Sequence, residues 1–515
     1  MTATGALNLE TYELGKRFGS FTALSGVSMT VRAGTVHALL GENGAGKSTL
    51  VKCLVGYHRP DTGSVLIDGR EQAISSPTVA RSLGLGMVYQ HFTVVPGMTV
   101  AENLLVAKGA LPWVIDWPKV RAELDAFMQG APFALPLDAT PMQLSAGEKQ
   151  KLEILKQLYL RPRLLILDEP TSVLTPQEAD EVLGALKERA HSGECTVVMI
   201  THKFREVIEF ADDVTVLRRG AHVGSRAVAG TSAAELASMM VGGGDAAQAA
   251  ATDAPVDRAN ARGGAPGDVC LSVRGLQVTG DRGEPAVAGL DLEVRRGEIV
   301  GIAGVSGNGQ RELMEALAGQ RERVGGDVRV AGQAYRATRG QNRRLRVRGL
   351  PEEPLRNACV GAMSVADNIG LRSFDAPPYA RGGWRVPGAL TRRARELVAT
   401  YRVKTRGPGE PIRALSGGNV QRAVLARELS DDAELLLVSN PVFGLDFTAV
   451  AEVHARLAAA RDRGAAVLMV SEDLDELLAL ADRIVVMSGG RVVHECAAAG
   501  ADRHDIGRHM GGHAH

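Results

Sequence analysis

The sequence predicts an α/β fold in two tandem copies, and three observations support this prediction. A glycine-rich loop from Gly41 to Thr49 stands between an apolar run and a helical pattern. Two further apolar runs end in polar residues, as strands of an open parallel sheet do where a ligand binds. The motifs of the first half return in the second, at residue 304 after 41, 415 after 144 and 435 after 164. A chain of 515 residues also exceeds what one hydrophobic core supports.

Composition is that of an ordinary globular protein, with 45% hydrophobic and 23% charged residues. Lys plus Arg equals Asp plus Glu at 59 each, so no nucleic-acid partner is expected. The 5 cysteines are scattered without a CxxC pair, which favours neither a zinc site nor a disulfide framework and suits a reducing cytosol. We expect neither a signal peptide nor a membrane-spanning run, so membrane association would need partner chains.

The glycine-rich loop fits the phosphate-binding pattern of Gly, four residues, Gly, Lys and Ser. Glycines let backbone N–H groups turn toward a phosphate, and the following helix adds the positive end of its dipole. Lys47 would reach the β- and γ-phosphates, and the Ser48 hydroxyl would ligate Mg²⁺. A strand over 36–40 and a helix over 48–55 are predicted on either side. The whole loop is predicted to bind the nucleotide: Gly41, Glu42, Asn43, Gly44, Ala45, Gly46, Lys47, Ser48 and Thr49.

Three more strands are predicted around this loop. The stretches 12–18 and 23–31 are typical of edge strands that precede the loop, and 84–89 is typical of a core strand. Phe18 would stack on an adenine face, although an ordinary core phenylalanine remains an alternative. Gln90 at the end of the core strand would bridge Mg²⁺, the attacking water and whatever lies beyond the site.

A helix is predicted to begin at Leu144-Ser-Ala-Gly-Glu-Lys-Gln150. Ser145 is a natural N-cap, and Glu148 three residues later completes a capping box. An ordinary well-capped helix and an anion-binding helix start are both compatible with this pattern.

Two acids, Asp168 and Glu169, follow the buried strand predicted over 164–167. Adjacent acids there are costly unless they are paired or near a metal. Asp168 would hold Mg²⁺, and Glu169 would accept a proton from the attacking water. His202 follows another predicted strand, over 196–200. Because the carboxyl ends of parallel strands meet at one edge, we expect Lys47, Gln90, both acids and His202 to converge.

The motifs GENGAGKST, YQ, LSAGE, LILDEP and THK, in this order and spacing, resemble an ABC-type ATPase domain. The resemblance covers both copies, and the fused pair is similar to the ATP-binding subunit of bacterial sugar and nucleoside importers. It implies two tandem P-loop ATPase domains, each with a mainly parallel sheet core, an antiparallel β part and a helical subdomain. It also implies ATP and Mg²⁺ as cofactors, 144–150 as the family signature, and His202 as a switch that senses the γ-phosphate.

The second copy departs from the family pattern in its phosphate loop and its acidic motif. The counterparts of the first copy's Lys47, Ser48, Gln90, Asp168, Glu169 and His202 are Gln310, Arg311, Glu352, Ser439, Asn440 and Glu472. By contrast, the signature at Leu415-Ser-Gly-Gly-Asn419 is closer to the family pattern than LSAGE, and Asp446 keeps an expected acid. The resemblance implies head-to-tail pairing of the two domains. One site would then be complete, because the first copy's groups meet Ser416, Gly417, Gly418, Asn419 and Asp446.

We predict a first ATPase domain over 7–244, a linker over 245–268 and a second, degenerate domain over 269–512. The resemblance implies integral-membrane permease subunits as direct partners, docking near 90–102, and an extracytoplasmic solute-binding protein as an indirect one. It places the chain peripherally on the cytoplasmic face of the cell membrane. Residues 439–441 and 471–474 resemble the nucleoside branch more than the ribose or galactose branch.

The alternative function is that of a soluble twin ATPase acting in translation or DNA repair. Such proteins often carry a basic linker or zinc-binding insertions, and neither is visible in this sequence. The histidines near the end, His504, His509, His513 and His515, could bind a metal, although a frayed tail is the interpretation the sequence favours.

Overall fold

The computed structural model describes residues 5–19, 21–42, 44–109, 111–241, 266–281, 283–430, 432–442, 445 and 447–510. The chain forms two compact units, Met1–Ala254 and Pro255–His515, which are considered one at a time. The domain limits 7–244 and 269–512 stay predictions. Most of the predicted linker, over 245–265, lies outside the described residues.

The first unit alternates strands and helices. In order it contains β1 (Leu9–Phe18), β2 (Phe21–Val31), β3 (Val36–Gly41), α1 (Lys47–Leu54), β4 (Thr62–Ile67), β5 (Arg70–Gln72), α2 (Pro77–Ser82), β6 (Leu85–Val88), α3 (Val100–Ala107), α4 (Trp117–Gln129), α5 (Ala146–Tyr159), β7 (Leu164–Asp168), α6 (Pro176–His191), β8 (Thr196–Ile200), α7 (Phe204–Phe210), β9 (Asp213–Arg218), β10 (Ala221–Ala227) and α8 (Ala233–Val241). The strands and the two helices that the sequence predicts are confirmed to within a few residues.

The core of this unit is a mainly parallel sheet in the order β10-β9-β3-β8-β7-β6, with only β10 antiparallel. Its central strands β3 and β8 are buried along their whole length, which is why they read as continuous apolar runs rather than alternating ones. The register aligns the strand ends, since Ile200 lies opposite both Leu39 and Asp168. Polar residues that follow β3, β7 and β8 therefore emerge at the same edge.

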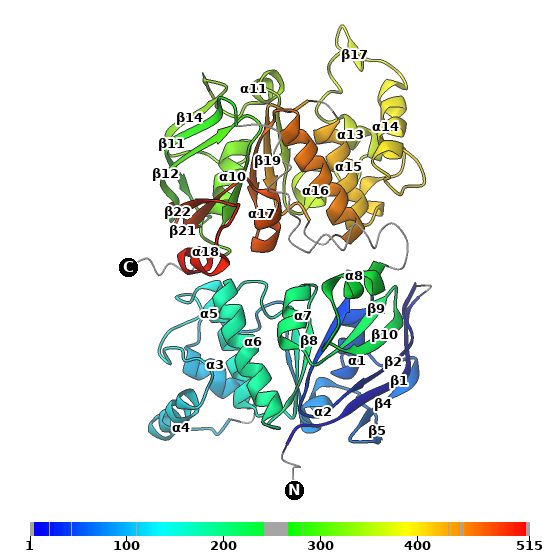
Figure 1. Ribbon diagram of the computed structural model, residues 1–515, viewed down its shortest axis with the longest axis vertical. Coiled ribbons are helices and arrows are strands. Elements are labelled where there is room, and N and C mark those ends of the chain that lie inside the picture. The colour runs from blue at the N-terminus through cyan, green and yellow to red at the C-terminus, as the bar shows by residue number, and fades with distance from the viewer. Residues whose placement is uncertain are drawn as a thin grey trace. The chain divides into compact units, whose positions relative to one another are not determined.

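Two further layers complete the first unit. The antiparallel sheet β2-β1-β4-β5 packs on α1, and α3, α4 and α5 form a helical part on the other side of the unit (Figure 1). The predicted capping box of α5 is present: the Glu148 N–H donates to Ser145 Oγ at 3.2 Å, and the Ser145 N–H donates to Glu148 Oε2 at 2.8 Å. The predicted α/β class with parallel, antiparallel and helical parts is confirmed.

The second unit repeats this plan. In order it contains β11 (Val269–Thr279), β12 (Pro285–Arg295), β13 (Ile299–Ala303), α10 (Gln310–Ala318), β14 (Gly325–Val330), β15 (Gln333–Ala334), α11 (Arg339–Arg344), β16 (Val347–Leu350), α12 (Pro354–Asn357), α13 (Val365–Gly370), β17 (Ala380–Arg381), β18 (Trp384–Arg385), α14 (Ala389–Thr400), the 3₁₀ turn Ile412–Ala414, α15 (Gly417–Leu429), β19 (Leu435–Ser439), α16 (Phe447–Asp462), β20 (Ala466–Val470), α17 (Leu474–Leu480), β21 (Arg483–Ser488), β22 (Arg491–Ala497) and α18 (Arg503–Met510).

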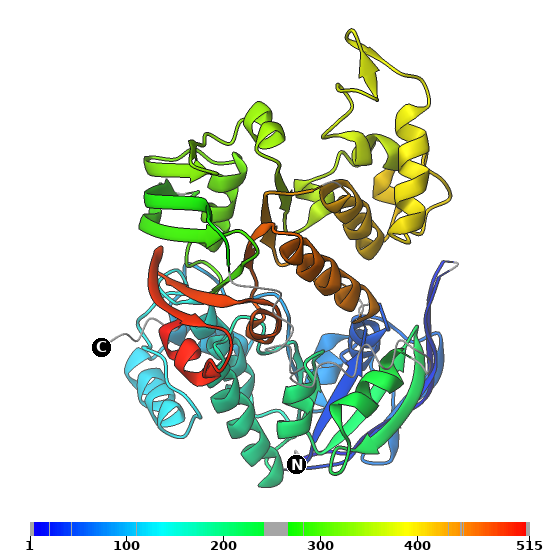
Figure 2. The same ribbon diagram turned by 45° about the horizontal axis from the view of Figure 1, so that its top comes forward.

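Its sheets have the orders β16-β19-β20-β13-β21-β22 and β12-β11-β14-β15. Both views show the antiparallel sheet on one side of β19 and helices α13 to α16 on the other (Figures 1 and 2). A buried apolar cluster joins the helical side to the parallel sheet, and a second joins α10 to the antiparallel sheet. Across the described parts of both units, every helix is too short or too polar to cross a bilayer.

One histidine is enclosed in the first core. His37 on β3 is 1% exposed, and its Nε2 lies 2.8 Å from Thr215 Oγ1 on β9. Its Nδ1 is buried without a hydrogen-bond partner among the described residues. Burial lowers the pKa of His37 to about 4, opposed by Asp213 and reinforced by Arg32.

His37 should therefore make stability depend on pH. Its folded pKa of about 4 lies below the usual 6.5, so the unfolded chain binds the extra proton between these values. The free energy of unfolding should fall by up to about 3 kcal/mol as pH drops from 6.5 to 4. Denaturant unfolding of His37→Gln should show a flatter profile there, whereas the exposed control His504→Gln should not. A wild-type slope in His37→Gln would contradict the assignment.

Candidate functional site

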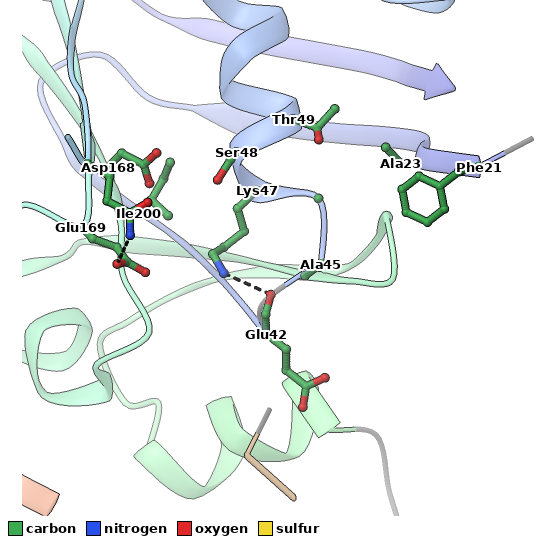
Figure 3. Close-up of a pocket in the computed structure, with 13 residues that line it drawn as sticks. Phe21, Ala23, Glu42, Ala45, Lys47, Ser48, Thr49, Asp168, Glu169 and Ile200 are labelled. Atoms are coloured by element: carbon green, nitrogen blue, oxygen red, sulfur yellow. Dashed lines mark hydrogen bonds between the residues drawn. The ribbon is translucent and has the colours of Figure 1, made fainter. Parts of the chain in front are cut away.

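A pocket of about 220 Å³ opens at the carboxyl edge of the first parallel sheet (Figure 3). The loop between β3 and α1 forms one side, and the end of β7 forms the other. The lining residues are Phe21, Ala23, Glu42, Gly44, Ala45, Gly46, Lys47, Ser48, Thr49, Gln90, Asp168, Glu169 and Ile200. The structure thus brings together the predicted phosphate loop, Gln90 and both predicted acids.

Lys47 is the first residue of α1 and is buried. Its ammonium donates to the Gly41 carbonyl at 2.5 Å and to the Glu42 carbonyl at 3.1 Å, the second shown dashed in Figure 3. Burial lowers the pKa of Lys47, and the charges of Glu169, Asp168 and Glu42 oppose that shift. The loop thus holds a cation beside the N-terminus of α1, which suits a phosphate.

Glu169 accepts hydrogen bonds from two of its predicted companions. Gln90 Nε2 donates to one carboxylate oxygen at 2.9 Å, and His202 Nδ1 lies 3.2 Å from the other. Glu169 has a φ of 49°, unusual for a residue with a side chain, and its N–H donates to the Ile200 carbonyl at 3.0 Å. Side chains that follow two different strands, β6 and β8, therefore hold the carboxylate, and β8 also fixes its backbone, which is the arrangement expected for a group that must orient a reactant.

The two adjacent acids differ in their surroundings. Hydrogen bonding to His202 is the main factor that lowers the pKa of Glu169, with further help from Lys47. Burial, followed by the negative charge of Glu169, raises the pKa of Asp168. A divalent cation beside Asp168 would stabilise its charged form and so oppose both the burial and the repulsion from Glu169. The oxygens of Ser48, Gln90 and Asp168 all line the pocket and are the ligand type that Mg²⁺ prefers, so these residues fit the ion.

Glycine is required at the last position of the loop. Gly46 has a φ of 101°, and a Cβ there would lie 2.8 Å from the Ala23 carbonyl oxygen and 2.9 Å from Leu24 Cδ2. At Gly44 a Cβ would meet nothing within 4 Å, so only its φ of 81° disfavours a side chain. Because β2 approaches the loop at Gly46, glycine is sterically necessary there, whereas at Gly44 only the backbone conformation favours it.

Other predicted residues lie elsewhere or are not described. Phe18 is not among the residues that line the pocket; it contacts His58 edge to face, whereas Phe21 lines the pocket. The sequence analysis did not predict Phe21 as a pocket residue. The signal that could have found it is that Phe21 is a second aromatic residue, three positions after Phe18. Stacking of Phe18 on adenine stays a prediction. Asn43 and Asp446 lie outside the described residues.

The predicted signature helix of the second unit, α15, begins differently from α5. Ser416 is its N-cap residue, but its Oγ accepts a hydrogen bond from Asn419 Nδ2 at 2.8 Å, and among the described residues no backbone N–H is capped by it. Gly417 and Gly418 follow with no side chains. The N–H of Asn419 donates to the Ser416 carbonyl at 2.9 Å, so the helix start offers at most the N–H groups of Gly417 and Gly418 to a ligand.

The second unit keeps the backbone of the first site with different side chains. Gln310 is buried at the position of Lys47, and its Nε2 donates to the Val305 carbonyl at 3.2 Å. Asn440 matches Glu169 in conformation, with a φ of 42° and its N–H on the Val470 carbonyl at 2.8 Å. Its Oδ1 accepts the N–H of Glu472 at 2.9 Å, where the first unit has the Glu169–His202 pair.

A pocket also exists here, of about 480 Å³, and it includes Gln310, Arg311, Ser439, Asn440 and Glu472. Arg311 stands where Ser48 does, and its guanidinium pairs with Glu315 at 2.8 Å. The second unit therefore has space for a ligand beside its loop, but neither the buried ammonium nor the carboxylate pair of the first.

The chain was compared with protein families and with solved structures. The model of the family described as "ABC transporter" matches residues 24–172 and 287–442, so it matches the chain twice. A solved nucleotide-free ATP-binding cassette from an ABC transporter is 26% identical over 43% of this chain and 91% of its own, with a TM-score of 0.40.

Curated relatives match along nearly their whole length. The nucleoside import ATP-binding protein NupA of Lactococcus lactis is 37% identical over 94% of this chain and 94% of its own. The guanosine import ATP-binding protein NupO of Bacillus subtilis is 36% identical, over 98% and 97%. The ribose import ATP-binding protein RbsA 1 of Rubrobacter xylanophilus is 38% identical, over 97% of each chain.

Replacing Lys47 tests the pocket as a phosphate site. Lys47→Ala removes the buried ammonium, and a charge-assisted contact is worth about 1.5–3 kcal/mol. Binding of a fluorescent ATP analogue to the full chain should weaken by about 10- to 100-fold. Gln310→Ala, at the matching position of the second unit, should leave that binding unchanged. Equal weakening by both substitutions would show that the two loops contribute alike.

Proposed function

Because the chain belongs to the ABC transporter family, we propose that it is the ATP-hydrolysing subunit of an importer for a nucleoside or a simple sugar. The chain is an ATPase, and separate permease subunits would carry the solute. The single observation that supports this proposal best is the pair of side-chain contacts, from Gln90 and His202, on the Glu169 carboxylate. A buried lysine, a carboxylate and a glutamine line the pocket beside the phosphate loop, and His202, which is not among the lining residues, contacts the carboxylate.

Each group of the first site would have a separate task. Lys47 neutralises phosphate charge, and the loop N–H groups bind phosphate oxygens. Glu169 orients the attacking water and accepts its proton, and Gln90 and His202 hold that carboxylate in place. Mg²⁺, when bound by Ser48, Gln90 and Asp168, would supply further neutralisation of the phosphates. The lowered pKa of Glu169 keeps it anionic at neutral pH, so it can act without first losing a proton.

We further propose one competent site and one degenerate site, on the basis of the family resemblance. In the competent site the first unit's pocket residues would work with the second unit's Ser416 to Asn419 and Asp446. The degenerate site would combine Gln310, Arg311, Ser439 and Asn440 with the LSAGE segment of the first unit. Side-chain amides there replace both the ammonium and the carboxylate, so hydrolysis is not expected.

The transported solute is proposed to be a nucleoside. Nucleoside and ribose relatives match at nearly equal identity, 37%, 36% and 38%, so identity alone does not decide. The proposal rests on residues 439–441 and 471–474, which resemble the nucleoside branch. Through its permease the chain would work indirectly with an extracytoplasmic solute-binding protein, peripherally at the cytoplasmic face of the membrane.

Permease docking is proposed near Gln90 to Glu102 and the segment that follows. Phe92, Val95 and Trp113 are exposed apolar side chains, and Trp113 is essentially fully accessible. Thr93 in this segment is held by two side chains of α5, because its Oγ1 donates to Glu153 at 2.9 Å and accepts from Lys156 at 2.9 Å. A segment held at Thr93 and Val95 and apolar at its surface suits transmission of motion from the Gln90 site to a partner.

Glu169→Gln keeps the shape and removes the base. ATP binding should persist, while steady-state phosphate release should fall by at least about 100-fold, within the range for loss of a general base. The measurement is phosphate release and nucleotide binding on the same preparation. Asn440→Gln in the second unit is the matched control and should leave turnover intact. Wild-type turnover in Glu169→Gln would refute the assignment.

Arginine substitutions test the proposed composite site. Ser416→Arg puts a long cation at the uncapped start of α15 and should abolish hydrolysis, although it lies in the other unit from Lys47. Ser145→Arg removes a helix cap worth about 1 kcal/mol and should lower the thermal midpoint while retaining most hydrolysis. Equal loss of phosphate release in both variants would argue against a single competent site.

A further inference from the structure

A cluster of potential metal ligands lies at the end of the second unit, where α18 packs on β21 and β22 (Figure 1). His494 on β22 and Asp505 and His509 on α18 each offer a ligand atom, and these atoms lie within 4.8 Å of one another. His494 Nε2 is 3.6 Å from Asp505 Oδ2. The two imidazoles stack, with centroids 4.2 Å apart and planes 14° apart.

The hydrogen bonds of the cluster leave ligand lone pairs available. His509 Nδ1 lies 2.8 Å from the Asp505 backbone carbonyl, which can only accept, so Nδ1 carries the proton. In the neutral ring Nε2 then has the free lone pair, as in metal-binding histidines whose other nitrogen bonds a carbonyl. Asp505 Oδ1 accepts from Arg508 at 2.8 Å, while Oδ2 faces His494. His509 Nδ1 is also 3.9 Å from Asp505 Oδ1, so the His509 ring must turn to bring Nε2 to the cluster.

The first unit shows that the fold does not need this cluster. By the register of β10 with β22 and α8 with α18, Gly224, Glu235 and Met239 correspond to His494, Asp505 and His509. A Cβ on Gly224 would lie 3.1 Å from Met239 Cε, so these two positions face each other there as well. An apolar glycine–methionine contact fills the first location. An acid occupies the same position in both units, so it is the two histidines of the second unit that packing alone does not explain.

We propose that His494, Asp505 and His509 bind a divalent transition-metal ion such as Zn²⁺ and join α18 to β22. Imidazole nitrogens with one carboxylate are a ligand set that suits zinc and neighbouring metals rather than Mg²⁺ or Ca²⁺. Bond lengths of about 2.0–2.2 Å require the ligand atoms to approach one another, which the partly exposed side chains can do by rotation. Three protein ligands leave a fourth position for water. The site is remote in sequence from every residue assigned to hydrolysis.

Calorimetric titration of the nucleotide-free full chain with Zn²⁺ tests this proposal. Wild type should bind one tight equivalent, and thermal unfolding should shift upward with added Zn²⁺. The variant His494→Gly with His509→Met installs the first unit's pair, and it should weaken binding by more than about 10-fold and remove the shift. Asp505→Asn, which changes only the carboxylate, should weaken binding too and covers the case in which the double variant does not fold.

Two controls separate this cluster from the other terminal histidines. His504→Ala and a chain ending at Met510 should both retain the tight equivalent. ATP hydrolysis measured without added zinc should not change in any variant, so failure here is distinct from failure of the proposed function. The proposal is overturned if wild type binds no tight zinc, if the chain ending at Met510 loses it, or if the double variant binds as wild type does.

Discussion

Parallel pairing in the central sheets decides where every polar group of the candidate site lies. In the first unit β3 pairs with β8 and β8 with β7, in a register that ends all three strands at one edge. Each strand is apolar because helices and the antiparallel sheet cover it, so polar residues appear only after it ends. Lys47, Glu169 and His202 converge for this reason, although they are far apart in the chain.

The same pairing holds in the second unit, where β13 pairs with β20 and β20 with β19. The backbone there places Gln310 and Asn440 where Lys47 and Glu169 stand in the first unit. Comparing the two units thus distinguishes the position of a site residue from its charge. The sheet register supplies position, and the residue types supply charge, so one unit can lose its charges without losing its architecture.

Much of this arrangement follows from residue order alone. The strands 36–40, 164–167 and 196–200 and the cap at Ser145 depend on local apolar runs and local hydrogen bonds, and such features are written into neighbouring residues. Phe21 is different, because which of two aromatics faces the loop depends on how β2 lies against α1. His37 and the pair of His494 with His509 are different too. The surroundings of His37 are set by strands distant in the sequence. The sequence marked His509 as one of several terminal histidines, but only the packing of α18 on β22 brings it to His494.

The left-handed backbone at the end of β7 and β19 has a further consequence. A glutamate tolerates this conformation at Glu169 only with strain of about 1–3 kcal/mol, whereas asparagine adopts it far more readily at Asn440. Asparagine in the second unit therefore places less strain on the backbone than glutamate does in the first. Replacing Asn440 by glutamate would therefore put a less tolerant residue into the same backbone conformation, at a cost in stability that the first unit already carries at Glu169.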